Sequence, residues 1–340
     1  MIPTPEELEG IVERFAEVNV LVVGDAMLDH TVWGKVDKSP DLPEFRWRLK
    51  VDREEHGLGG AANAAANVVS IGAHASLMFA AGLDEAGDQI YAKTKELGIG
   101  RYRINEGNRR TVVKQRVYET NGVNPNYIGR LDFDWGMMPV NADTVEILRN
   151  RLREFKCDFN AVLIEDYAKG LIVPEVIDLV KDFARDKKIP VIVDPNRVHP
   201  CAEYEGVSIL KPNRGEASLY LPVQGRQWNQ IAYDLSKKLG SQLVLTDGKE
   251  GMYVVNKEGE LTHIQGISME GKVIDTVGAG DCVAAVLAAC AGLKLDIVAS
   301  ATIANVAAAV AISQGKVCGR PTPESLIKTY HQVYPSLMKR

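Results

Sequence analysis

The stretch Gly278-Ala279-Gly280-Asp281 combines residue types that can handle a phosphate group. An alanine-rich pattern that predicts a helix follows it directly, so the turn lies at a helix N-terminus. Backbone amides there lack partners within the helix, and small side chains let a phosphate come close to them. The carboxylate of Asp281 suits a reaction in which it takes a proton from a hydroxyl that attacks the phosphate. The alternative is an ordinary helix start with an aspartate near its cap.

A second informative stretch runs from His56 to Asn67. Its Gly59-Gly60 turn opens a predicted helix whose first turns carry only small side chains. Asn63 and Asn67 are four residues apart and share one helix face. Because asparagine is a poor helix former, the pair predicts hydrogen bonds to a partner on that face, while the alanines pack on the other. A dinucleotide fingerprint is disfavoured, because the glycine spacing differs and no apolar strand precedes the turn.

Two segments, at about residues 31–51 and 111–132, interrupt the regular pattern of the chain. The first reads as irregular, with strand-like pieces in which basic and aromatic residues are interleaved, and residues 111–117 alternate strictly as in a strand. Lys114 and Arg116 share one face of that strand, and Arg130 lies on the expected return strand. These cations either protect a solvated sheet edge or close over an anionic substrate. We predict that the two segments form a small β-lid.

Elsewhere, apolar runs alternate with helical patterns, and polar loops bearing Gly or Pro follow the runs. This order predicts one domain, residues 1–340, with an α/β fold: a doubly wound, mostly parallel sheet with helices on both faces. Asp25 and Asp29 follow the first strand, where a loop-capping role is favoured for either one alone. Asn213 and Glu216 open a helix, either as a capping box or as the ligands of a hydrated Mg²⁺.

Composition excludes several classes of function. The net charge is −5 and no basic run is present, which argues against a nucleic-acid partner. The five cysteines form no Cys-x-x-Cys pair and are expected to be reduced thiols of a cytoplasmic protein. No signal peptide is indicated. Lys294 and Asp296 interrupt the apolar stretch from Val283 to Ile312, so it predicts two core helices and no membrane span.

The sequence Asp275-Thr276-Val277-Gly278-Ala279-Gly280-Asp281 closely resembles the second signature of the PfkB (ribokinase-like) carbohydrate kinases, Asp-Thr-x-Gly-Ala-Gly-Asp. The stretch from His56 to Gly72 resembles the first signature, Asn213 to Glu216 the Asn-x-x-Glu element, and Thr246 to Gly251 the nucleotide loop. The likeness extends from about residue 20 to 322. Within the family, the chain is most similar to the D-glycero-D-manno-heptose 7-phosphate kinases of lipopolysaccharide precursor synthesis. The segments that carry this likeness include 22–29, 111–117, 130–134 and 166–170.

The resemblance implies a ribokinase-like fold, the substrates and the roles of the site residues. Asp281 would be the general base, and the backbone of Gly278, Ala279 and Gly280 would hold the transferring phosphoryl group. Sugar binding is implied for Asp29, Gly59, Gly60 and Asn63, and sugar-phosphate binding for Lys114, Arg116 and Arg130. Asn213 and Glu216 would bind Mg²⁺, through water, and the ATP phosphates. Nucleotide binding is implied for Thr246, Gly248 and Asn305. Lids of this type often pair between subunits in the family, which implies a homodimer.

Departures from the heptose kinases concern mainly the sugar side. Those enzymes read Arg-Ile-Ser-Pro-Glu-Ala-Pro-Val-Pro where this chain has residues 37–45, and Asp-Pro-Lys-Gly where it has Asp194 to Arg197. Cys282 stands where threonine is usual. These differences affect the identity of the sugar more than the kinase chemistry. Many heptose kinases are fused to a nucleotidyltransferase; no His-x-Gly-His occurs here, so the kinase step alone is expected.

The expected reaction is therefore phosphorylation of heptose 7-phosphate to the 1,7-bisphosphate. A PfkB kinase for a hexose, ribose or nucleoside is the main alternative, although an unphosphorylated substrate does not need three converging cations. A catalytically silent sugar- or nucleotide-binding regulator is a further alternative, against which the intact Gly278 to Asp281 stretch argues.

Overall fold

The computed structural model describes residues 2–37, 48–105, 108–120, 125–136, 138–155, 157–267, 276–314 and 319–338. Several features expected from the sequence lie outside these ranges. They are Asp275 of the second signature, the turn at Asn121-Gly122, Cys318, and residues 38–45 of the segment that departs from the heptose kinases.

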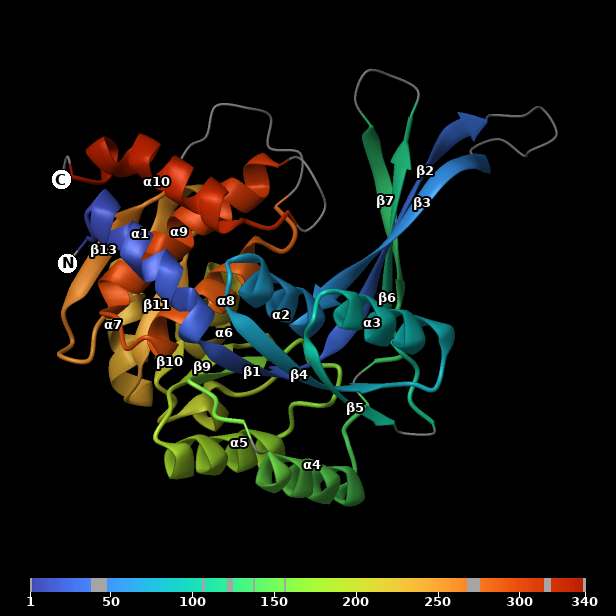
Figure 1. The fold of residues 1–340 in the computed structure, drawn as a ribbon, viewed down its shortest axis with the longest axis horizontal. Coiled ribbons are helices and arrows are strands. Elements are labelled where there is room, and N and C mark those ends of the chain that lie inside the picture. Colours follow the sequence, from blue (N-terminus) through green and yellow to red (C-terminus); the bar gives the residue numbers. More distant parts are fainter. Residues whose placement is uncertain are drawn as a thin grey trace.

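A central sheet organises the described residues, and its strands follow the order β13-β12-β11-β10-β9-β8-β1-β4-β5 (Figure 1). Neighbouring strands are parallel from β5 to β11, and the pairs β11–β12 and β12–β13 are antiparallel. The apolar runs Val20–Val23 and Ala161–Ile164 are fully buried because helices cover both faces of the sheet. The strands are β1 (Asn19–Gly24), β4 (His74–Ala81), β5 (Gly100–Asn105), β8 (Ala161–Glu165), β9 (Val191–Asp194), β10 (Ile209–Leu210), β11 (Gln242–Thr246), β12 (Gly251–Val255) and β13 (Leu261–Gln265).

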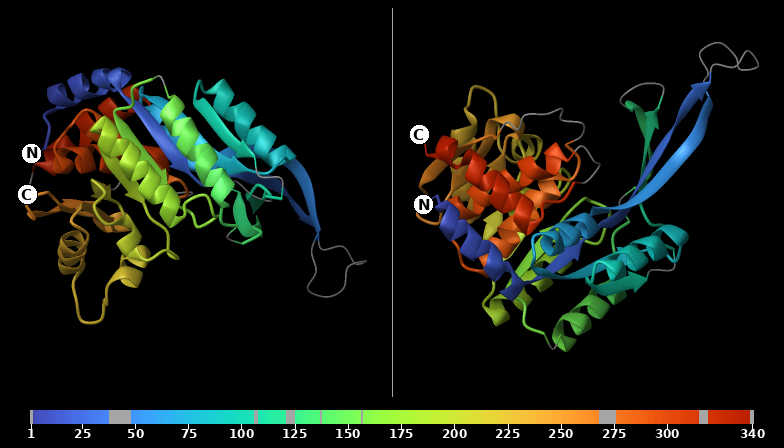
Figure 2. Two further views of the ribbon diagram at one scale, coloured as in Figure 1. Left: turned by 90° about the horizontal axis from the view of Figure 1, so that it is seen from below. Right: turned by 45° about the horizontal axis from the view of Figure 1, so that its top comes forward.

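Helices pack on both faces and divide the interior into two cores (Figure 2). One core contains residues of α1 (Pro5–Arg14), α2 (Ala61–Ser70), α3 (Glu85–Glu96), α8 (Ala279–Gly292), α9 (Ile297–Ser313) and α10 (Pro323–Leu337). The other contains residues of α4 (Ala142–Glu154), α5 (Pro174–Lys187), α6 (Arg214–Tyr220) and α7 (Trp228–Leu239). The α/β fold with a mostly parallel sheet is confirmed.

The apolar stretch of the C-terminal third forms two adjacent helices, as expected. Helices α8 and α9 pack against each other, and nearly all of their residues are buried. Within the described ranges, the structure contains no helix long and apolar enough to cross a membrane.

The lid is a four-stranded sheet with the order β3-β2-β6-β7 that projects away from the body (Figure 1). Its strands are β2 (Ala26–Asp37), β3 (Arg48–Gly60), β6 (Val113–Glu119) and β7 (Asn126–Phe133). The β-lid is confirmed, and the described parts of 31–51 form longer and more regular strands than the strand-like pieces that the sequence indicated. Most of β3 is exposed on both faces, so it carries charged residues without the apolar alternation by which strands are recognised.

Candidate active site

The N-terminus of α8 is open, as the Gly-Ala-Gly turn predicts. Gly278 is the N-cap with φ 82°, a left-handed conformation that glycine adopts without strain, and none of the described side chains caps this helix end. Ala279 and Gly280 form the first two helical positions. Both line the cavity beside the strand ends, and their small side chains leave the backbone there accessible to an anion.

Asp281 is the third residue of α8, and its side chain is buried. Asn63 Nδ2 donates to Asp281 Oδ2 at 2.7 Å, and the hydroxyl of Tyr167 donates to Oδ1. Burial raises the pKa of Asp281 to about 6, and the hydrogen bonds from Tyr167 and Asn63 oppose that rise. Of the two asparagines on the α2 face, Asn63 reaches this carboxylate, and Asn67 Nδ2 donates to the backbone oxygen of Asn63 at 2.9 Å.

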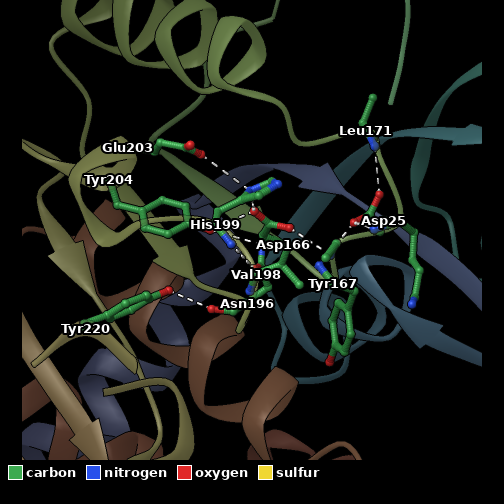
Figure 3. Close-up of polar contacts among 12 residues, drawn as sticks. Asp25, Asp166, Tyr167, Leu171, Asn196, Val198, His199, Glu203, Tyr204 and Tyr220 are labelled. Atoms are coloured by element: carbon green, nitrogen blue, oxygen red, sulfur yellow. Dashed lines mark hydrogen bonds and ion pairs between the residues drawn. The ribbon is translucent and has the colours of Figure 1, made fainter. Parts of the chain in front are cut away.

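The loop that carries Tyr167 is held by Asp25, which lies just after β1 (Figure 3). Asp25 Oδ2 accepts from the backbone amides of Tyr167 at 3.1 Å and Lys169 at 2.9 Å, and Oδ1 accepts from that of Leu171 at 3.0 Å. Asp25 is thus the loop-capping aspartate that its position suggested. Burial raises its pKa to about 6, against the effect of the three amides.

A buried polar network supports the same loop from the other side (Figure 3). His199 Nδ1 lies 2.9 Å from Asp166 Oδ2, which also accepts from the Tyr204 hydroxyl at 2.8 Å. The hydrogen bond to Asp166 raises the pKa of His199. The contact between His199 and Asp166 thus joins the loops after β8 and β9. Tyr220 of α6 donates to the backbone oxygen of Asn196 at 2.6 Å and so ties the loop after β9 to α6.

The lid places two of the three expected cations beside these residues. Arg116 Nη1 donates to Asp29 Oδ1 at 2.7 Å, and both side chains are buried. Lys114 lies over the Tyr167 ring, with Nζ 5.0 Å from its centroid. Burial lowers the pKa of Lys114, while Asp29 and Asp281 favour its charged form. Arg130 is partly exposed and pairs with Asp132 at 2.7 Å on its own strand.

The glycines before α2 bring the lid close to the body. A Cβ on Gly59 would lie 3.0 Å from Asp29 Oδ2, and one on Gly60 would lie 2.4 Å from the backbone oxygen of Asp25. Gly60 also has φ 56°, so a side chain there would be strained. The strand β3 ends at this turn, directly before α2, although it is not an apolar strand.

Asn213 and Glu216 form the capping box of α6. Glu216 Oε2 accepts from the backbone amide of Asn213 at 2.8 Å, Oε1 accepts from Asn213 Nδ2 at 2.5 Å, and Asn213 Oδ1 accepts from the amide of Glu216 at 3.0 Å. Both residues also line the large cavity described below, so they remain accessible to a ligand while they cap the helix.

A cavity of about 1310 Å³ extends from the α8 N-terminus along the carboxyl ends of β8 to β11. Thr246, Gly248 and Asn305 line it, as expected for the nucleotide side. Asn305 Nδ2 donates to the backbone oxygen of Gln265 at 2.8 Å. An apolar wall beside Asn305 is formed by Met252, Ile267, Val283, Ala308, Ala309 and Ile312.

Sequence reasoning assigned no role to three further residues of this site. Tyr167 contacts Asp281, and Lys211 Nζ lies 2.9 Å from Asp194 Oδ2 on the cavity floor. The three residues are Tyr167, Asp194 and Lys211. Their positions in the sequence could have indicated a role, because each lies at or just after the end of a strand, where α/β proteins bind ligands.

A model of the pfkB family of carbohydrate kinases matches residues 18–324. The chain belongs to this family. It is therefore an ATP-dependent sugar kinase. Proteins named "Bifunctional protein HldE" from Geobacter metallireducens and Trichlorobacter lovleyi are each 34% identical to it, over 92% and 90% of this chain. The kinase spans 62% of the length of each of these relatives.

Solved structures show the same ribokinase-like fold. Phosphofructokinase-2 from Escherichia coli, in complex with substrates and products, has a TM-score of 0.75 at 16% identity and covers 93% of the kinase and 99% of its own chain. Ribokinase from Arabidopsis thaliana, complexed with ribose and ATP, has a TM-score of 0.68 at 22% identity and covers 92% and 98%.

We predict that replacing Asp25 by alanine destabilises the kinase and lowers its turnover. One buried and two partly buried amides lose their acceptor, at a cost of about 1–3 kcal/mol for each that stays unsatisfied. The released loop also moves Tyr167 away from Asp281. Thermal unfolding and turnover measure the two effects. Asp158→Ala, an exposed control, should change stability by no more than about 0.5 kcal/mol. A variant D25A with wild-type stability contradicts the role of this carboxylate.

Proposed function

We propose that the kinase phosphorylates a sugar that already carries a phosphate, and that this substrate is heptose 7-phosphate, giving the 1,7-bisphosphate of lipopolysaccharide precursor synthesis in the cytoplasm. The observation that carries the proposal is the position of Lys114. This lid cation is mostly buried over the Tyr167 ring, beside Asp281, and no carboxylate among the described residues pairs with it. The likeness to the HldE proteins supports the same substrate.

Asp281 acts as the general base in this proposal. Asn63 and Tyr167 orient its carboxylate, and the carboxylate accepts the proton of the sugar hydroxyl as the hydroxyl attacks the γ-phosphate of ATP. The backbone of Gly278, Ala279 and Gly280 stabilises the charge on the transferring group, because the uncapped end of α8 carries a positive partial charge. Asp29, Gly59 and Gly60 shape the sugar side under the lid.

The cavity fits ATP with Mg²⁺. Its apolar wall beside Asn305 suits an adenine ring, Thr246 and Gly248 lie on the nucleotide side, and the oxygen donors of Asn213 and Glu216 suit a hydrated Mg²⁺. When bound, Mg²⁺ supplies positive charge that offsets the charge of the phosphates. In this proposal Asn213 and Glu216 hold the ion through water, since each already forms hydrogen bonds in the α6 cap.

A kinase for an unphosphorylated sugar is the second candidate. Two of the three lid cations are already neutralised, Arg116 by Asp29 and Arg130 by Asp132. The lid then offers one cation, Lys114, to a substrate phosphate. A neutral sugar does not require a cation in the lid, so this arrangement is also compatible with an unphosphorylated substrate.

Replacing Asp281 by asparagine tests the general base. We expect turnover to fall by about 10²–10⁴-fold, because proton transfer loses its acceptor, while ATP binding and stability change little. Turnover with Mg-ATP and calorimetric titration of ATP measure these effects. Asp296→Asn, in the N-cap of α9 outside the cavity, is the matched control and should retain wild-type turnover. Near wild-type turnover of D281N refutes the assignment.

A sugar panel, combined with a lid variant, tests the substrate. ADP release is measured with heptose 7-phosphate, sedoheptulose 7-phosphate, fructose, fructose phosphates, ribose and adenosine. We expect turnover on heptose 7-phosphate and a rise in its KM of about tenfold or more for Lys114→Met, because a charge-assisted hydrogen bond contributes about 1.5–3 kcal/mol. Lys35→Met, on an exposed position of β2, should keep the wild-type KM. Turnover on a neutral sugar alone refutes the phosphate-binding role of the lid and leaves that of Asp281 untouched.

We also propose that the lid pairs two copies of the chain. Leu131 and Phe133, two residues apart and so on one face of β7, are 50% and 44% exposed. Sedimentation equilibrium should show a dimer that Leu131→Asp dissociates. Leu219→Asp, at an exposed site on α6, should leave the dimer intact. A monomeric wild-type protein contradicts this proposal.

A further inference from the structure

Three acidic side chains from separate elements meet beside the cavity, and Asp194 lines it. Glu165 ends β8, Asp194 ends β9 and Asp281 lies in the first turn of α8. One carboxylate oxygen from each lies within 4.8 Å of the others. A Cβ on Gly280 would lie 3.9 Å from Asp194 Oδ2, so the cluster lies next to the backbone at the N-terminus of α8.

Glu165 has no part in the reaction proposed above, and its surroundings are unusual. Its side chain is fully buried, and neither carboxylate oxygen has a hydrogen-bond partner among the described residues. An ionised carboxylate in such a place costs several kcal/mol unless a positive charge compensates it. Asp194 and Asp281 have partners, respectively Lys211 and the pair Asn63 and Tyr167. Of the three carboxylates, Glu165 is thus the one with both oxygens available to bind an ion.

The charge balance of the cluster is consistent with one divalent cation. Three ionised carboxylates and the single ammonium group of Lys211 sum to −2, which an ion of charge +2 neutralises. Glu216 lies nearby, but both of its oxygens accept hydrogen bonds from Asn213 in the α6 cap. The donors of the cluster are all oxygen atoms, which favours hard cations such as Mg²⁺ and Mn²⁺.

We propose that Glu165 and Asp194 ligate a divalent cation directly at the base of the cavity, and that this ion binds in the absence of nucleotide. Asp281 faces the ion through water, because Tyr167 and Asn63 already engage its two oxygens, so it keeps its capacity to accept a proton. Water fills the remaining positions, as is usual for Mg²⁺ in proteins. This ligand set is separate from Asn213 and Glu216, where the ion that accompanies ATP is proposed to bind.

The experiment is a titration of the full chain with Mn²⁺, without ATP or sugar, followed by electron paramagnetic resonance. We expect one Mn²⁺ to bind per chain and Mg²⁺ to displace it. Glu165→Gln, which keeps the shape and removes the charge, should weaken the binding by about tenfold or more. Glu216→Gln is the matched control and should bind Mn²⁺ as the wild type does, because its carboxylate belongs to the other ligand set.

Thermal unfolding with and without Mn²⁺ gives a second readout. The ion should raise the unfolding temperature of the wild type and of E216Q, and should have no such effect on E165Q. If E165Q does not fold, Asp194→Asn is measured in its place with the same expectation. Three results overturn the proposal: no Mn²⁺ binding by the wild type, wild-type affinity in E165Q, or loss of binding in E216Q with binding kept in E165Q. Because no substrate is present, the outcome does not depend on which sugar is phosphorylated.

Discussion

The buried carboxylate of Asp25 is the interaction on which the geometry of the active site depends. It lies at the end of β1, near the middle of the sheet, and accepts hydrogen bonds from three amides of the loop after β8. That loop presents Tyr167, whose hydroxyl contacts Asp281 and whose ring lies under Lys114. One aspartate therefore fixes a loop that touches both Asp281 at the α8 N-terminus and the lid. An isolated loop could not hold this position, since its amides would prefer water.

The site concentrates negative charge where a phosphoryl group must be transferred. Burial raises the pKa values of Asp194 and Asp281 to about 6, and Lys211 opposes the rise for both. Burial and the neighbouring carboxylates raise the pKa of Glu165 well above its usual value. Such an arrangement is unfavourable for the fold by itself. It is consistent with a site whose normal occupants include cations, because a bound ion replaces the solvation that burial removes.

The lid connects substrate recognition to the same centre. Register in the lid sheet places Asp29 beside Lys114, and Thr31 beside Arg116. The buried pair of Asp29 and Arg116 then orients both side chains without exposing either. Removing one partner would leave the other charge buried and unpaired. The pair therefore stabilises the base of the lid and also fixes the positions of both charged groups. Lys114, over the Tyr167 ring, is the lid cation that we propose for substrate binding.

The sequence alone determined the α/β fold, the open turn before Asp281 and the expectation that Asn63 forms a hydrogen bond on its helix face. These features are local: apolar runs, helix starts and glycine turns act over a few residues, so their spacing reveals them. The β-lid was expected, but the full length of β2 and β3 was not. Most of β3 is charged and exposed and shows no apolar period, whereas β2 is buried along most of its length. Tertiary structure alone decided that Asp25 holds the loop of Tyr167, that Asp29 neutralises Arg116, and that Glu165, Asp194 and Asp281 meet. Those contacts join positions up to 146 residues apart in the case of Asp25 and Leu171. No local pattern encodes them. The contacts of Asp25 and of the three carboxylates arise when parallel strands bring their carboxyl ends to one edge of the sheet, and the pair of Asp29 and Arg116 arises when β2 and β6 pair in the lid.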